Sequence, residues 1–223
     1  MKRHLQVELE NLKKRILFLG GLVEEGVRQA VKALRTRDGG LARKVIAGDL
    51  GIDELEVEIE EECLKVLALH QPVAVDLRFI TAVIKINNDL ERVGDMAVNI
   101  AERVLVIVKA PPIFISFDYN EMAQKVEAML KMSLDSLVNL DADMAYRVGL
   151  MDDEVDIMNH LCYDVVKEDL KKTPHRVSCL INLLLVARHL ERIADHATNI
   201  AEEVIYMMEG EIHRHVGSLE DGS

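Results

Sequence analysis

The residues of this chain that could do chemistry form two stripes of oxygen ligands. Each stripe follows the pattern Glu-x-x-x-Asp-x-x-x-Asn-x-x-Glu, which occurs in LERVGDMAVNIAERV at 90–104 and again in LERIADHATNIAEEV at 190–204. On a helix of 3.6 residues per turn, the four polar residues of a stripe fall within roughly 80° of one another. Carboxylate and amide oxygens on one helix face could bind a hard metal cation. The stripes consist of Glu91, Asp95, Asn99 and Glu102, and of Glu191, Asp195, Asn199 and Glu202.

A second pair of acids precedes each stripe with the spacing Asp-x-x-x-Asp. The pairs are Asp49 with Asp53 and Asp152 with Asp156. Each pair lies about 20 residues before a predicted helix break, and the stripe begins about 20 residues after the same break. Antiparallel helices would therefore place both sets at one level, roughly 30 Å from the turn. The spacing predicts two carboxylate quartets, one in each half of the chain, which the Asn and Glu of each stripe could extend by two turns.

Four carboxylates at one level repel one another unless they are protonated or bound to a cation. A bound metal would relieve this repulsion, and all-oxygen ligation suits Mg²⁺, Ca²⁺, Mn²⁺ or iron rather than a structural zinc site. The alternative is an ordinary solvated helix face, because apolar residues occupy the opposite side of the same helix. Helical periodicity alone fits both interpretations.

The elements that must position these acids are predicted to be helices. The chain has 223 residues, 49% of them apolar, with four prolines and no tryptophan, which favours an all-α protein. The breaks predict six long helices. The first is expected at about 4–36, the second from there to 69, and the third from Pro72 to 109; the others are expected at 118–139, 142–172 and 175–209.

Two adjacent prolines, Pro111 and Pro112, lie at the midpoint of the repeat and mark a linker. We therefore predict two tandem, pseudo-symmetric three-helix bundles. The first occupies 1–110, a linker follows at 111–117, and the second bundle occupies 118–209. The polar segment 210–223 is expected to be a disordered tail.

Charge and missing motifs exclude several classes of function. A net charge of −12 would repel nucleic acid and anionic lipid, so neither is expected as a direct partner. The longest uncharged apolar run, 177–187, is too short to span a bilayer, and no export signal is expected because the N-terminal segment has no long apolar stretch. Three cysteines without metal-binding spacing fit a cytoplasmic protein. We expect no enzymatic activity, because the chain lacks the P-loop, GxSxG, GxGxxG and Glu-x-x-His motifs.

The duplicated LER-[VI]-x-D-x-x-x-N-I-A-E phrase, the segment HQPVAVDLRFI at 70–80 and the two Asp-x-x-x-Asp pairs resemble the PhoU family of phosphate-uptake regulators. The similarity extends from about 5 to 208. It implies two tandem three-helix bundles and a likeness to members whose paired acidic motifs bind multinuclear iron or zinc clusters on the protein surface. The implied metal residues are Asp49, Asp53, Glu91, Asp95, Asp152, Asp156, Glu191 and Asp195.

The same resemblance implies a role that spacing could not reveal. PhoU-like proteins act in the cytoplasm, as homodimers, and link the Pst phosphate transporter to a PhoR-type sensor histidine kinase. They keep the phosphate-starvation response off when phosphate is plentiful. The implied partners are the ATPase subunit of the transporter and the kinase, with membrane contact only through them. The alternative is a metal-binding or storage protein without a signalling role.

The two halves differ at the turn between their last two helices. The first half has Asp76-Leu77-Arg78 after the turn, and the second half has no evident counterpart. Arg78 is a candidate partner-binding residue, and pairing with a carboxylate inside the bundle is an equally good interpretation.

Overall fold

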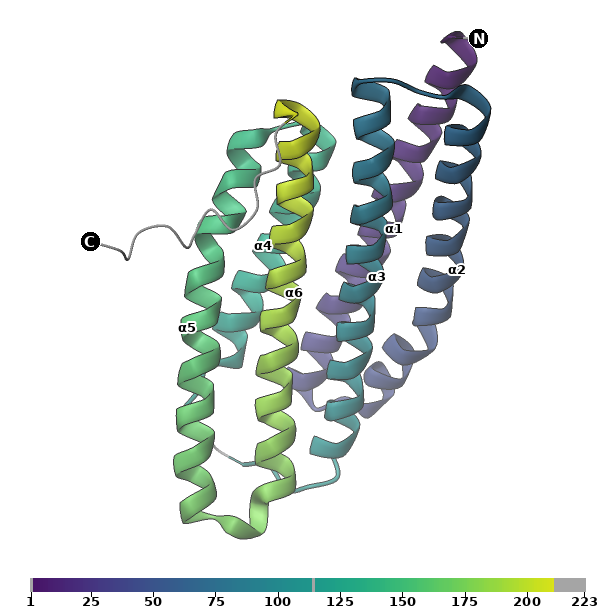
Figure 1. Cartoon of the computed structure of the whole chain (residues 1–223). Helices are drawn as coiled ribbons and strands as arrows, with labels where there is room; N and C mark the ends of the chain where they lie inside the picture. Colours follow the sequence, from purple (N-terminus) through teal and green to yellow (C-terminus); the bar gives the residue numbers. More distant parts are fainter. Residues whose placement is uncertain (1, 114, 211–223) are drawn as a thin grey trace, which may run out of the picture.

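The structure is a computed structural model that describes residues 2–113 and 115–210. Figure 1 shows the described chain as long helices joined by short connections, which confirms the all-α prediction. The helices are α1 (Lys2–Thr36), α2 (Gly39–His70), α3 (Val75–Ile107), α4 (Tyr119–Asn139), α5 (Ala142–Lys172) and α6 (Val177–Glu209), and one 3₁₀ turn, η1 (Pro174–Arg176), precedes α6. Apart from Gly210, the predicted disordered tail lies outside the described residues.

Aspartate side chains begin three of the helices. The Asp38 carboxylate accepts hydrogen bonds from the backbone N–H groups of Gly40 and Leu41 at the start of α2, and Asp118 and Asp141 cap α4 and α5 in the same way. Such caps satisfy N–H groups that have no partner within the helix. They fix where the helices that carry the Asp-x-x-x-Asp pairs begin.

The start of α3 differs from the prediction. Pro72 was expected to begin this helix, but α3 begins at Val75. The preceding connection contains two residues with positive φ, Gln71 at 45° and Ala74 at 50°, so the backbone cannot continue as a right-handed helix there. The expected start at Pro72 was therefore wrong by three residues.

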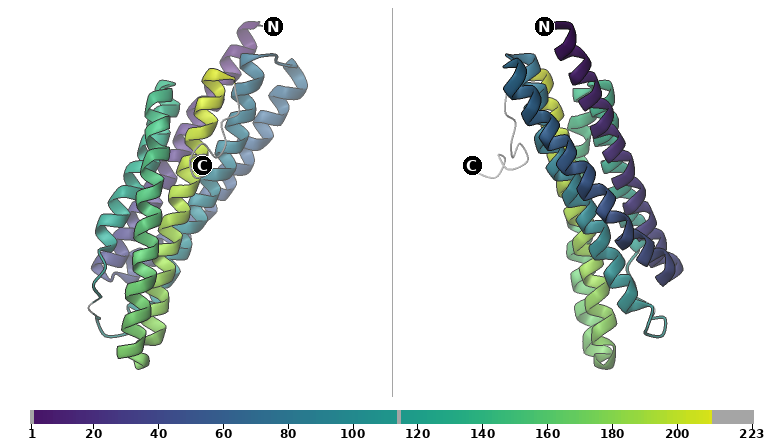
Figure 2. Two further views of the ribbon diagram at one scale, coloured as in Figure 1. Left: turned by 60° about the vertical axis from the view of Figure 1, so that its left-hand side comes forward. Right: turned by 90° about the vertical axis from the view of Figure 1, so that its right-hand side faces the viewer.

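Helices α1 to α3 lie side by side and form the first repeat, and α4 to α6 form the second repeat (Figures 1 and 2). The repeats meet mainly where α3 packs along α6, and α1 also contacts α4. Buried apolar side chains from all six helices belong to one cluster. Because the repeats share this core, a division into separate units at 111–117 stays a prediction.

Close helix contacts explain one glycine. Gly20 is buried in α1, where a Cβ atom would lie 2.8 Å from Cδ2 of Leu134 in α4. Its neighbour Gly21 faces open space. The absence of a side chain at Gly20 thus allows α1 and α4, one helix from each repeat, to approach closely. Within residues 2–113 and 115–210, no helix is both long and apolar enough to cross a membrane.

Candidate functional site

The first acidic cluster consists of Asp49 and Asp53 on α2 and Glu91 and Asp95 on α3. Helices α2 and α3 pack against each other, and Gly94 provides the close approach at this level. A Cβ atom on Gly94 would lie 3.5 Å from Oδ1 of Asp49. The antiparallel level-matching predicted from the sequence is therefore present.

Burial and mutual repulsion raise the pKa values of acids in the first cluster. The pKa of Asp49 rises from 3.8 to about 6, first because the carboxylate is partly buried and then because Asp53 and Asp95 are close. The pKa of Glu91 is raised by burial and by Asp95, with a smaller contribution from Asp53. A neighbouring cation would stabilise the ionised form of these carboxylates.

The second acidic cluster consists of Asp152 and Asp156 on α5 and Glu191 and Asp195 on α6. One carboxylate oxygen from each of Asp156, Glu191 and Asp195 lies within 4.8 Å of the others. Glu191 is 8% exposed, and its Oε2 atom has no hydrogen-bond partner among the described residues. Three oxygens at this separation could bind one cation, and the orphaned oxygen of Glu191 is a ready ligand.

Burial and mutual repulsion also raise the pKa values of acids in the second cluster. Burial, then Asp195 and Asp156, raise the pKa of Asp152 from 3.8 to about 6. The pKa of Glu191 is raised by burial and by Asp195, and the pKa of Asp195 is raised by burial and by Asp156. Both repeats therefore hold four acids that repel one another at neutral pH.

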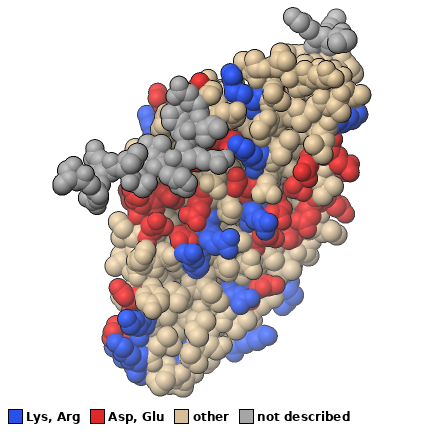
Figure 3. Space-filling model, viewed as in Figure 1, with Lys and Arg blue, Asp and Glu red and all other residues tan. Residues whose placement is uncertain are grey.

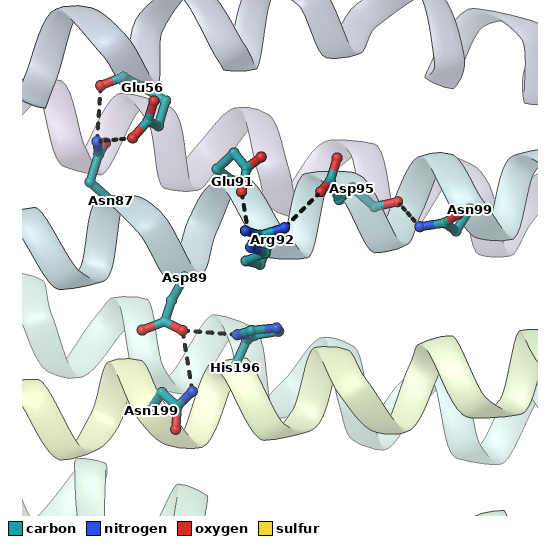
Figure 4. Close-up of polar contacts among 9 residues, drawn as sticks. All are labelled: Glu56, Asn87, Asp89, Glu91, Arg92, Asp95, Asn99, His196 and Asn199. Atoms are coloured by element: carbon teal, nitrogen blue, oxygen red, sulfur yellow. Dashed lines mark hydrogen bonds and ion pairs between the residues drawn. The ribbon is translucent and has the colours of Figure 1, made fainter.

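Arginine side chains partly offset this repulsion. Arg92 lies between two acids of the first cluster, with Nε 3.5 Å from Glu91 and Nη1 3.6 Å from Asp95 (Figure 4). In the second cluster, Arg188 donates a hydrogen bond of 2.5 Å to Oε1 of Glu191. Figure 3 shows acidic side chains in two groups on one face, over α5 and α6 and over α2 and α3, with basic side chains between and below them.

The predicted extensions of the two sites are engaged in other contacts. Asn99 donates to the backbone oxygen of Asp95 in its own helix, and Glu102 pairs with Arg103 at 3.0 Å. Glu102 is about 10 Å further along α3 than Asp95. Asn199 points to the first repeat, as described below, and Glu202 is partly buried on α6. The four acids of each cluster lie close enough to interact electrostatically, but among the described residues only Asp156, Glu191 and Asp195 place ligand oxygens within 4.8 Å of one another. The Asn and Glu residues of the stripes lie outside the clusters.

The sequence analysis missed a polar contact between the repeats. Asp89 on α3 accepts hydrogen bonds from Nδ2 of Asn199 at 3.2 Å and lies 2.8 Å from Nδ1 of His196, both on α6 (Figure 4). Lys85 binds Glu203 across the same interface at 2.8 Å. No signal in the sequence indicates this contact, because it depends on α3 packing along α6, which the repeat does not specify.

Arg78 contacts the far end of the second repeat. Its guanidinium lies beside Gly210, the residue that ends α6, where a Cβ atom would be 3.6 Å from Nη1. No ion pair joins Arg78 to a carboxylate of the described residues, so the predicted pairing within the bundle is not seen. A cation at this position is favoured by the negative end of the α6 dipole. Its partner-binding role stays a prediction.

The donor chemistry of both clusters fits a metal. Every ligand is a carboxylate oxygen, which suits hard cations and iron. The repulsion between the carboxylates can be relieved by protonation, and a bound cation would relieve it without protonation. Which residues actually hold metal, and which metal, stay predictions.

Comparisons with known proteins agree with this arrangement. A family model described as PhoU domain matches residues 16–104 and 119–204, one match in each repeat. The chain is 41% identical to a phosphate-specific transport system accessory protein PhoU homolog from Aquifex aeolicus, with 96% of this chain and 97% of that protein covered. It is 38% identical to a homolog of the same description from Caulobacter vibrioides, over 92% of this chain and 89% of that protein.

Solved structures share the fold. The crystal structure of PhoU from Pseudomonas aeruginosa has a TM-score of 0.86 and 36% identity, with 92% of this chain and 99% of that chain covered. The phosphate transport system regulatory protein PhoU from Streptococcus pneumoniae has a TM-score of 0.84 and 29% identity, over 94% of this chain and 99% of that chain. These matches identify non-enzymatic accessory and regulatory proteins with two helical repeats. The chain therefore belongs to the PhoU family.

Proposed function

We propose that this protein is a negative regulator of phosphate uptake and of the phosphate-starvation response. The observation that carries the proposal is the match of both repeats, over nearly the whole chain, to proteins described as accessory to phosphate-specific transport. The protein would act in the cytoplasm as a homodimer.

The two acidic clusters would hold multinuclear metal centres of iron or zinc. Their raised pKa values support this role, because an acid that is costly to ionise in the free protein is stabilised when a cation binds beside it. Mg²⁺, Mn²⁺ and Ca²⁺ are also compatible with all-oxygen ligation. Metal bound in a cluster would hold its carboxylates in place and lower the negative charge of the surrounding surface.

The metal-loaded faces would bind the ATPase subunit of the Pst transporter and a PhoR-type sensor kinase. Each partner has active and inactive states, and a binder can shift such an equilibrium only by binding one state more tightly. We propose that this protein binds the inactive kinase state and the resting transporter more tightly when phosphate is plentiful.

Alkaline phosphatase activity in phosphate-rich medium tests the proposal. The source organism, a strain without this protein and a complemented strain would be compared. High activity in the deletion strain, reversed by complementation, is the expected result. Low activity in all three strains would contradict the regulatory role and favour metal binding or storage alone.

A further inference from the structure

Two histidines and a glutamate converge at the end of the first repeat that is remote from both acidic clusters. His4 and Glu8 lie one turn apart on α1, and His70 is the last residue of α2. About 21 residues of helix, or roughly 30 Å, separate His70 from Asp49. None of these three residues belongs to the duplicated acidic pattern.

The three side chains point at one another. Nε2 of His70 lies 2.6 Å from Oε2 of Glu8, and Nε2 of His4 lies 3.4 Å from Oε1 of the same carboxylate. The two imidazole rings are 5.8 Å apart, centre to centre. One ligand atom from each residue lies within 4.8 Å of the other two, so a single ion could contact all three after small side-chain rotations.

The burial of the cluster is unusual for a simple surface pair. Only 10% of the His70 side chain and 17% of the Glu8 side chain are exposed. Nε2 of His70 and Oε2 of Glu8 face each other at ion-pair distance, but they are not aligned as a hydrogen bond, and neither atom has a hydrogen-bond partner among the described residues. Apart from this mutual ion pair, which requires a protonated imidazole, the two buried atoms have no partner among the described residues, and a cation bound between them would satisfy both.

The donor set differs in kind from that of the acidic clusters. Two imidazole nitrogens and one carboxylate oxygen suit zinc and related divalent transition metals, whereas all-carboxylate sites suit harder ions. Three protein ligands leave a coordination position for water. The C-terminal end of α2 also carries partial negative charge, which favours a cation at His70.

We propose that His4, Glu8 and His70 form a separate binding site for a divalent transition metal of the zinc type. The metal would join the first turn of α1 to the last turn of α2 and so fix the connection that leads into α3. The site lies in the first repeat only, since the second repeat has Lys172 and Thr173 where α2 ends in His70.

Cobalt(II) is a suitable probe, because a four-coordinate ion with nitrogen ligands absorbs visible light far more strongly than a six-coordinate ion bound only by oxygen. The full chain would be freed of metal with a chelator and titrated with cobalt, and zinc would then be added to displace it. The variants would be His4→Gln, Glu8→Gln and His70→Gln. His175→Gln, which removes an exposed histidine of η1, is the matched control, and Asp95→Ala/Asp195→Ala disables the acidic clusters.

The wild type, His175→Gln and the Asp95/Asp195 double variant should give the strong band, and zinc should remove it. One equivalent of zinc should suffice in the double variant, where the acidic clusters do not compete for the metal. Each of the three site variants should lose the band and bind zinc at least tenfold more weakly, a loss at the lower end of the roughly 10–100-fold seen even for outer-shell partners of metal ligands. A weak cobalt spectrum in the wild type would overturn the proposal. So would a band that survives in His4→Gln, a variant expected to keep its fold because the side chain is 74% exposed; circular dichroism would check this.

Discussion

Replacing Asp152 with asparagine should stabilise the metal-free protein at neutral pH. Burial, Asp195 and Asp156 raise the pKa of Asp152 to about 6, against 3.8 without these effects. The difference of roughly two pKa units corresponds to about 3 kcal/mol of opposition to ionisation in the folded state. Because the side chain is only partly buried, solvent screening lowers the expected gain to about 1–2 kcal/mol.

The sign of the pH dependence follows from proton binding. Between pH 3.8 and 6 the folded state holds a proton on Asp152 that the unfolded state has released, so the wild type loses stability as pH rises through this window. The asparagine variant does not lose this contribution. Its advantage should be complete at pH 7.5 and fall to about a third of that value at pH 4.5.

Thermal unfolding in the presence of a chelator measures this advantage. A gain of about 1–2 kcal/mol corresponds to a rise in Tm of about 2–8 °C for a chain of this size. Asp164→Asn, an exposed substitution on the same helix, is the matched control and should leave Tm nearly unchanged. Equal Tm values for wild type and Asp152→Asn at pH 7.5, or a difference that does not depend on pH, would refute the electrostatic reasoning. An added divalent cation should favour the wild type instead, because the variant lacks a ligand.

Three further predictions concern the packing of the helices. Gly20→Ala should be about 1–3 kcal/mol less stable in urea than Gly21→Ala, because only the first added methyl meets a leucine of α4; equal stabilities would contradict this contact. Asp89→Ala should cost about 0.5–1.5 kcal/mol by removing the hydrogen-bond partner of the half-buried His196 and of the exposed Asn199 of α6, whereas Asn88→Ala, an exposed neighbour, should cost little; matching urea midpoints would argue against the inter-repeat bonds. Burial raises the pKa of Cys63 to about 12, so peptide mass spectrometry should find this thiol protected from alkylation in the folded protein, and labelling as fast as in urea would show that it is accessible.

Much of this architecture could be predicted from sequence because it depends on local signals. Asp38 and Asp118 are aspartates just before apolar helical patterns, and both cap helices in the structure. The acidic pairs could be placed at one level from helical rise alone, and Asp49 and Asp95 do interact. Periodicity and spacing were enough for these features.

Features that depend on backbone exceptions or on packing between repeats could not be predicted in this way. The positive φ of Ala74 delays α3, and nothing in that residue's type indicates it. The pairing of Asp89 with His196 depends on α3 packing along α6, which a sequence repeat does not specify. The convergence of His4 and His70 also required the three-dimensional arrangement, because 66 residues separate them in the chain.

Metal content tests the central claim about the acidic clusters most directly. Wild type and the Asp95→Ala/Asp195→Ala variant would be purified identically and analysed by elemental mass spectrometry, with Glu54→Ala/Asp164→Ala as a control that removes exposed acids from α2 and α5. The account predicts multinuclear metal in the wild type and the control, and a loss of most of it in the cluster variant. Equal metal content in all three proteins would contradict the assignment of the two carboxylate clusters as metal centres.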